Sequence, residues 1–159
     1  MSALLRPQAQ LQPLMLRDLD AVLAIEVSAY RFPWSRGNFI DSLSAGYLAE
    51  MVVDARAAPI AYCVAMPGVD EMHLLNLTVA PPYRRQGHAC ALLDSLQAHC
   101  RDSGLPTLWL EVRAGNERAR QVYARRGFSQ VGVRKGYYPA GLARREDALV
   151  MSLTLPQAH

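Results

Sequence analysis

Two arginines and a glycine stand directly before an expected helix in the segment RRQGHA, residues 84–89. A helix start presents backbone N–H groups and a partial positive charge, which together bind phosphate and other anions. Gly87 lets an anion approach the backbone closely, because glycine has no side chain to hold it off. The segment lacks the GxxxxGK[ST] of a Walker loop and the GxGxxG of a dinucleotide site. It therefore predicts an anion site of another kind, with a helix cap and solvated arginines as the alternative.

Glu111 and Tyr123 could move protons close to this site. Glu111 lies near the carboxyl end of the strand expected at residues 107–112, and open α/β sheets bind ligands at that end. Tyr123 lies two helical turns after Asn116, so both share one face of the next helix. A carboxylate can take a proton and a neutral phenol can give one. Glu111 alone could pair with an arginine such as Arg113, and Tyr123 alone could be a packing residue, but beside an anion loop they predict acid–base chemistry.

The charge of the chain is unevenly distributed. Residues 84–145 contain 12 basic and 4 acidic residues, a net charge of +8, whereas the remainder carries 5 basic and 10 acidic residues, a net charge of −5. A polyanionic ligand would favour the first region, and a cationic partner could approach the second. We expect acids of the second region, among them Glu26, Asp41, Glu146 and Asp147, to attract a basic peptide.

Composition excludes several classes of protein. With 159 residues, 51% of them hydrophobic and 19% charged, the chain has the length of one domain and the composition of neither a disordered nor a membrane protein. No apolar run approaches the roughly 18 to 20 residues that span a bilayer, and the first residues lack a signal-peptide pattern, so we expect a cytoplasmic protein. Cys63, Cys90 and Cys100 lack CxxC spacing and no HExxH is present, which predicts reduced core cysteines and no metal site.

Strand and helix patterns alternate along a single domain, residues 1–159. Ser35 has the position of an N-cap for a short helix, and Gly127 closes a later one. The strands form a meander followed by a strand, helix, strand crossover, which predicts a mixed α/β (α+β) sheet with helices on both faces. The expected strands are 11–16, 47–55, 60–66, 72–79, 107–112, 128–137 and 147–155, and the expected helices are 18–30, the segment after Ser35, 87–103 and 116–126.

Taken together, these motifs resemble the GNAT superfamily of N-acetyltransferases. RRQGHA matches the signature Arg/Gln-x-x-Gly-x-Gly/Ala of that family, and residues 116–128, NERARQVYARRGF, match its second cofactor motif. Shorter strings are similar to the RimI type, the ribosomal-protein alanine N-acetyltransferases: FPWS at 32–35, LNLTV at 75–79, LWLEVRAGN at 108–116, YYP at 137–139 and RED at 145–147. The similarity covers nearly the whole chain and departs at GLAR, residues 141–144. It implies a mostly antiparallel mixed sheet of about seven strands with about four helices.

The resemblance also implies acetyl-CoA as the cosubstrate and assigns a role to each motif. Glu111 would be the general base, directly or through water, Tyr123 the general acid, and the acceptor amine would attack the thioester directly. The Val79 amide would polarise the thioester carbonyl. The residues implied to bind the cofactor are Leu77, Thr78 and Val79 along the pantetheine, Arg85, Gln86, Gly87, His88, Ala89 and Cys90 around the phosphates, and Asn116 on the next helix.

For the acceptor, the resemblance implies the N-terminal alanine of the eighteenth small-subunit ribosomal protein. Trp34, Tyr137 and Tyr138 resemble walls of a peptide groove, although Trp34 or Tyr138 could equally be packing residues. One alternative is an acetyltransferase of a protein lysine or a small amine, which would share the cofactor site. Another is a non-catalytic ribosome- or RNA-binding module, which is disfavoured because the arginines are not interleaved with aromatic residues. We therefore expect a basic protein N-terminus as partner, without direct nucleic-acid or membrane binding.

Overall fold

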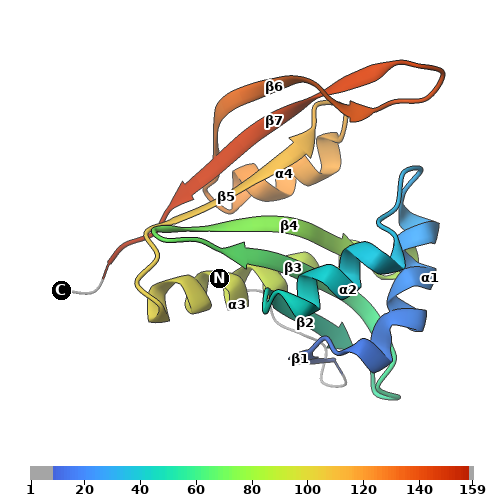
Figure 1. Ribbon diagram of the computed structural model, residues 1–159. Coiled ribbons are helices and arrows are strands. Elements are labelled where there is room, and N and C mark those ends of the chain that lie inside the picture. The colour runs from blue at the N-terminus through green and yellow to red at the C-terminus, as the bar shows by residue number, and fades with distance from the viewer. Residues whose placement is uncertain (1–8, 158–159) are drawn as a thin grey trace. The chain divides into compact units, whose positions relative to one another are not determined.

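Strands and helices alternate along the computed structural model, which describes residues 9–157 (Figure 1). Within that range it has the seven strands and four α-helices that the sequence predicts, with short 3-10 turns at Leu16–Asp18 and Pro81–Tyr83. The elements are β1 (Gln10–Pro13), α1 (Leu19–Ala29), α2 (Arg36–Ser44), β2 (Leu48–Val53), β3 (Pro59–Pro67), β4 (Glu71–Val79), α3 (His88–Asp102), β5 (Thr107–Arg113), α4 (Glu117–Arg125), β6 (Ser129–Pro139) and β7 (Arg145–Thr154). No helix of the described residues is long and apolar enough to cross a membrane.

The strands follow the order β1-β2-β3-β4-β5-β7-β6. The pairs β1/β2, β2/β3, β5/β7 and β6/β7 are antiparallel, and β4/β5 is parallel. A parallel pair requires the chain to return to the same end of the sheet, and α3 makes that crossover. The predicted mixed, mostly antiparallel sheet is confirmed.

The first strand is shorter than the sequence predicts. We expected residues 11–16, but β1 ends at Pro13 and a 3-10 turn follows. The Asp18 carboxylate accepts a hydrogen bond of 2.8 Å from the Met15 N–H, which satisfies a donor that a continued strand would have used. The apolar residues 14–16 therefore lead into α1 instead of extending the strand.

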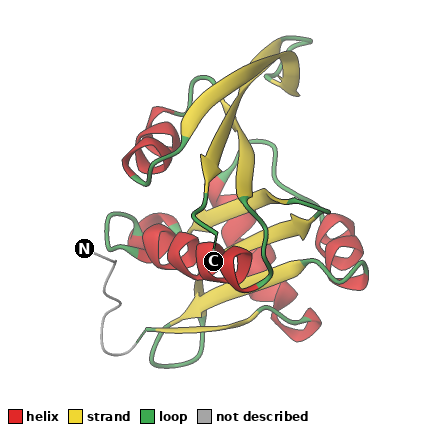
Figure 2. Cartoon of the chain, turned by 90° about the vertical axis from the view of Figure 1, so that its left-hand side faces the viewer, coloured by secondary structure: helices red, strands yellow, loops and turns green. Residues whose placement is uncertain are grey.

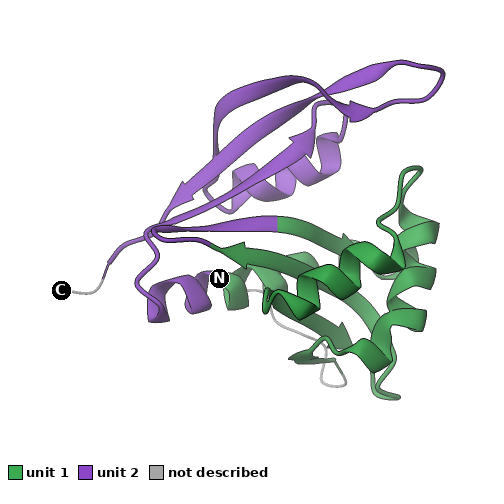
Figure 3. Ribbon diagram, in the orientation of Figure 1, with its two compact units in different colours: residues 1–67, 75–96 green, residues 68–74, 97–159 purple. Residues whose placement is uncertain are grey.

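The described residues form two compact units (Figure 3). Unit 1 comprises the residues up to 67 together with 75–96, and unit 2 comprises 68–74 and the residues from 97 onward, so β4 and α3 contribute to both. In unit 1 the strands lie between α1 and α2 on one face and the first part of α3 on the other (Figure 2). Leu92, Leu93 and Leu96 bury the inner face of α3, as their spacing predicts.

The two short helices of the chain begin at the residues that the sequence indicates. Ser35 caps α2, because its side chain accepts from the Asn38 N–H while the Asn38 side chain accepts from the Ser35 N–H. Asn116 caps α4 by accepting from the Ala119 N–H at 3.2 Å.

In unit 2, apolar residues occupy alternate positions of β5, TLWLEVR, a pattern that predicts one face on the core. Leu108, Leu110 and Val112 are buried, while Trp109 and Glu111 lie on the opposite face.

The three cysteines of the chain behave as core residues: none forms a disulfide, Cys63 and Cys100 are buried, and Cys90 is partly buried. Burial raises the pKa of the Cys63 thiol to about 12 and raises the pKa of Cys100. A nucleophilic role for either is therefore disfavoured.

Candidate functional site

The RRQGHA loop of unit 1 leads into α3 through two residues with positive φ angles. Arg85 and Gly87 both have positive φ angles, of 63° and 86°, and α3 begins at His88. Left-handed residues before a helix start can turn successive amides toward one point, an arrangement that binds anions in other proteins. The Ala91 N–H bonds to the Gly87 carbonyl at 2.9 Å and closes the first helical turn. The loop geometry thus fits a phosphate.

A pocket of about 360 Å³ lies beside this loop in unit 1. It is lined by Ala9, Asp54, Ala55, Arg56, Ile60, Tyr83, Gln86 and His88. The His88 imidazole is only 2% exposed and packs edge-on against Tyr83, with ring centroids 6.4 Å apart. Its imidazole therefore belongs to the interior, so the group that His88 can offer an anion is its backbone amide.

The end of β4 is hydrogen-bonded to the residue that follows α1. The hydroxyl of Tyr30, just after α1, donates to the Leu77 carbonyl at 3.1 Å and contacts the Thr78 hydroxyl at 2.7 Å. Thr78 in turn donates to the Asn76 side-chain oxygen at 2.7 Å. These bonds hold the Leu77 carbonyl and the Thr78 side chain, in the segment where the resemblance places the pantetheine.

Glu26 corrects an expectation. We expected its carboxylate on the surface, where it would attract a basic peptide, but Glu26 is 2% exposed. It follows Leu19 and Val22 on the buried face of α1. Its carboxylate accepts hydrogen bonds from the Tyr62 hydroxyl at 2.6 Å, the Trp34 N–H at 2.8 Å and the Asn76 amide at 3.1 Å. Burial and this carboxylate raise the pKa of Tyr62 far above its ordinary value, so Tyr62 remains a donor.

Glu26 therefore anchors the FPWS loop. The Trp34 backbone is bound to its carboxylate, and the Trp34 ring packs edge-on against Phe39 at 5.1 Å. Trp34 is partly buried against the core of unit 1. The ring thus has the packing role that was one of its two alternatives, and its place in an acceptor groove stays a prediction.

Replacing Glu26 by leucine is expected to lower the free energy of unfolding by about 2–4 kcal/mol, because three buried or half-buried donors lose their acceptor. Chemical denaturation measures this directly. Glu26→Gln keeps one acceptor oxygen and should cost less, and Asp41→Leu at an exposed position of α2 should change stability by only about 0.5 kcal/mol. Equal stability of Glu26→Leu and wild type would contradict the buried network.

In unit 2, Glu111 is held by two side chains that the sequence did not reveal. Its Oε1 lies 2.8 Å from His73 Nε2 and its Oε2 lies 2.7 Å from Arg134 Nε, and the Glu111 side chain is only 7% exposed. The Tyr137 hydroxyl also bonds to Glu111, and burial together with that carboxylate raises the pKa of Tyr137. An arginine partner was the structural alternative for Glu111, and the partner is Arg134.

Arg113 instead supports the YYP segment. Its guanidinium pairs with Glu146 at 3.1 Å, donates to the Pro139 carbonyl at 2.8 Å and lies 4.5 Å from the centre of the Tyr138 ring. Tyr137 contacts Tyr138 edge-on at 4.9 Å. The structure therefore places Tyr137 and Tyr138 in the same cluster as Glu111, with Tyr137 in direct contact with it.

The acids that follow this segment are engaged within unit 2. Glu146 accepts from the Gly115 N–H at 2.8 Å in addition to pairing with Arg113. Asp147 accepts from the Gly136 N–H at 2.9 Å. The Glu146 carboxylate thus binds β5 and the loop after it, and the Asp147 carboxylate binds β6, which weakens the expectation that they attract a peptide.

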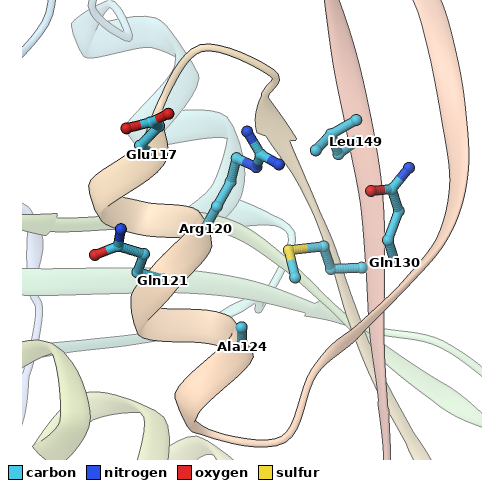
Figure 4. Close-up of a pocket in the computed structure, with 7 residues that line it drawn as sticks. Glu117, Arg120, Gln121, Ala124, Gln130 and Leu149 are labelled. Carbon is cyan, nitrogen blue, oxygen red and sulfur yellow. The ribbon is translucent and has the colours of Figure 1, made fainter.

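Tyr123 lies on the inner face of α4. It is buried and packs edge-on against Phe128 at 5.6 Å. The predicted residues are thus divided: unit 1 holds Trp34, Leu77, Thr78, Val79 and Arg85 through Cys90, and unit 2 holds Glu111, Asn116, Tyr123, Tyr137 and Tyr138. A second pocket in unit 2, of about 300 Å³, lies between α4 and the strands β6 and β7, and none of the predicted residues lines it (Figure 4).

Comparison with known proteins decides the family. Residues 19–128 match the model of the acetyltransferase (GNAT) family. The chain belongs to this family. The predicted acetyltransferase and its GNAT fold are confirmed.

Individual GNAT relatives agree with the RimI-type resemblance. The [ribosomal protein bS18]-alanine N-acetyltransferase of Haemophilus ducreyi is 37% identical over 87% of this chain and 95% of its own length. That of Escherichia coli K12 is 38% identical over 87% and 92%. The crystal structure of the Escherichia coli ribosomal-protein-S18-alanine N-acetyltransferase has a TM-score of 0.86 at 36% identity, covering 95% of this chain and 96% of that one. Ard1 from Thermoplasma volcanium, at 20% identity and a TM-score of 0.83, shares the fold.

Proposed function

We propose that this GNAT protein transfers the acetyl group of acetyl-CoA to the N-terminal alanine of ribosomal protein bS18. The observation that carries the proposal is the identity of 37–38% to two bS18-alanine N-acetyltransferases over 87% of the chain. The whole chain would act as one acetyltransferase domain. The strings FPWS and YYP, which match the RimI type, support an acceptor of the same kind.

Glu111 and Tyr123 are the proposed base and acid. Acetyl-CoA supplies an acetyl group activated as a thioester. Glu111 takes a proton from the acceptor amine, which must be neutral to attack, and the Tyr123 phenol protonates the departing sulfur. Arg134 pairs with Glu111, and an ionised carboxylate is the form that can take a proton. We assign the cofactor phosphates to the backbone of Arg85–Cys90, the pantetheine to Leu77–Val79 and a further cofactor contact to Asn116.

An α-amine suits this base better than a lysine does. The unperturbed pKa of an α-amine is about 7.7–8.0, against about 10.4 for lysine, so far less deprotonation is required near neutral pH. Trp34, Tyr137 and Tyr138 are the proposed walls around the N-terminal residues of the peptide. Acetylation of a lysine or of a small amine is the alternative, with the same cofactor site.

A peptide that begins with alanine followed by basic residues, including lysines, is expected to be acetylated only at its N-terminus. Mass spectrometry of the product locates the acetyl group. The matched control is the same peptide with a blocked N-terminus, which should not react. If the blocked peptide is acetylated on lysine at the same rate, the acetyltransferase assignment stands and the α-amine acceptor is wrong.

A further inference from the structure

His73 and Arg134 both pair with Glu111, and the His73 side chain is the more buried of the two. Its ring stacks on Trp109, its partner in the parallel β4/β5 pair, with centroids 3.7 Å apart and planes 10° from parallel. This stacking directs Nε2 to Glu111 Oε1 at 2.8 Å, and the His73 side chain is only 14% exposed. The contact fixes one carboxylate oxygen, while Arg134 holds the other.

The chemistry of the contact defines the state of His73. An ionised carboxylate only accepts hydrogen bonds, so Nε2 must carry the proton and donate. Burial lowers the pKa of His73, against the opposing effects of Glu111 and Glu71, and Arg134 lowers it further. Tyr137 is the remaining titratable group bonded to Glu111. At neutral pH the imidazole is therefore neutral, with its hydrogen on Nε2 and its lone pair on Nδ1.

We propose that His73 is the positioning residue of the general base: in its neutral form it orients the Glu111 carboxylate, and its protonation at low pH weakens Glu111 as a base. The proposal rests on the proposed role of Glu111. Protonated His73 would place a second cation beside a carboxylate that already pairs with Arg134, and a carboxylate held between two cations accepts a proton from the amine less readily.

Two variants separate the effect of the hydrogen bond to Glu111 from the effect of protonating His73. His73→Gln keeps a neutral N–H donor near the position of Nε2 but cannot titrate. His73→Leu fills similar space against Trp109 and has no donor. At pH 8 we expect His73→Leu to lower kcat roughly 10- to 100-fold, the worth of a hydrogen bond to a charged group, and His73→Gln to restore most of it, with the KM of acetyl-CoA unchanged in both. Wild-type kcat in His73→Leu would overturn the proposal.

A purely structural role of His73 would not change how kcat depends on pH, so the pH profile of kcat tests the proposal. Protonation of the acceptor amine lowers the rate of every variant, so the informative quantity is the ratio of kcat in His73→Gln to kcat in wild type. Burial lowers the pKa of His73, so this ratio should rise only at pH values well below the ordinary histidine pKa of about 6.5, where the wild type alone acquires the second cation. His99→Gln, in the last turn of α3, is the control and should give a flat ratio. A flat ratio for His73→Gln would overturn the pH dependence.

NMR titration of the imidazole tests the contact without using activity. Glu111 raises the pKa of His73, so Glu111→Gln should lower it. An unchanged His73 pKa in that variant would show that the contact is absent and overturn the proposal.

The turnover of the two variants distinguishes failure of this inference from failure of the proposed function. If Glu111→Gln loses turnover and His73→Leu keeps full turnover, only the positioning role of His73 is contradicted. If Glu111→Gln keeps full turnover, Glu111 is not the base, and the inference about His73 fails with it.

Discussion

Replacing Glu111 by glutamine is expected to lower kcat by roughly 10²- to 10⁴-fold near neutral pH, the usual worth of a general base. The substitution keeps the size of the side chain: the amide oxygen can accept from Arg134, and the amide NH2 can donate to His73 Nε2 once that imidazole takes its other tautomer. What is lost is the ability to take a proton from the acceptor amine. The affinity for acetyl-CoA should change little, because Glu111 is not assigned to the cofactor.

The pH dependence separates a base from a structural carboxylate. As the pH rises through the ordinary α-amine pKa of about 7.7–8.0, free amine forms without help, so the deficit of Glu111→Gln should shrink. Steady-state rates measured from pH 6 to about 9.5 cover that range. The matched control is Asp102→Asn, an exposed acid at the end of α3, which should retain wild-type kcat. Wild-type turnover of Glu111→Gln at pH 7 would show that Glu111 only pairs with Arg134.

Local patterns were sufficient for the elements around Glu111 and Tyr123. Alternation in β5 placed Leu108 and Leu110 inside and Glu111 on the other face, and the structure agrees. A helix beginning at Asn116 was also expected, and Asn116 is the N-cap of α4; Tyr123, for which packing was the alternative, is buried. Such features depend on the period of a strand or helix, which a single sequence contains.

The partners of Glu111 could not be predicted in this way. His73 is 38 residues away and meets Glu111 only because β4 and β5 pair with His73 opposite Trp109. Arg134 approaches from β6, which pairs with β7 and not with β5. Strand register and order are set by packing of the whole sheet, so no short pattern revealed either contact.

Glu26 was misplaced for a related reason. It has the spacing of the buried face of α1, after Leu19 and Val22, but a carboxylate is assigned to the surface by default. Tyr62 and Asn76, which satisfy it, come from β3 and β4. A signal was present, because an acid on the apolar stripe of a helix is a candidate for a buried hydrogen-bonded group.

Replacing Gly87 by valine is expected to weaken acetyl-CoA binding by roughly 100-fold or more, because two or more charge-assisted hydrogen bonds to phosphate would be lost. Gly87 has a φ angle of 86°, which a β-branched residue adopts only with strain, and the valine methyl groups would occupy the space in front of the first α3 amides. Calorimetric titration with acetyl-CoA gives the affinity, and circular dichroism establishes whether the variant is folded.

Backbone strain alone could weaken binding by destabilising the chain, and Gly104 provides the control. Gly104 also has a positive φ angle, of 68°, and a Cβ there would meet no heavy atom within 4 Å. Gly104→Val therefore imposes a similar backbone strain at the other end of α3, away from the proposed phosphate loop. Both variants should lose comparable stability, but only Gly87→Val should lose affinity. If a folded Gly87→Val binds acetyl-CoA as tightly as Gly104→Val does, the loop before α3 does not hold the phosphates and its glycine serves only the turn.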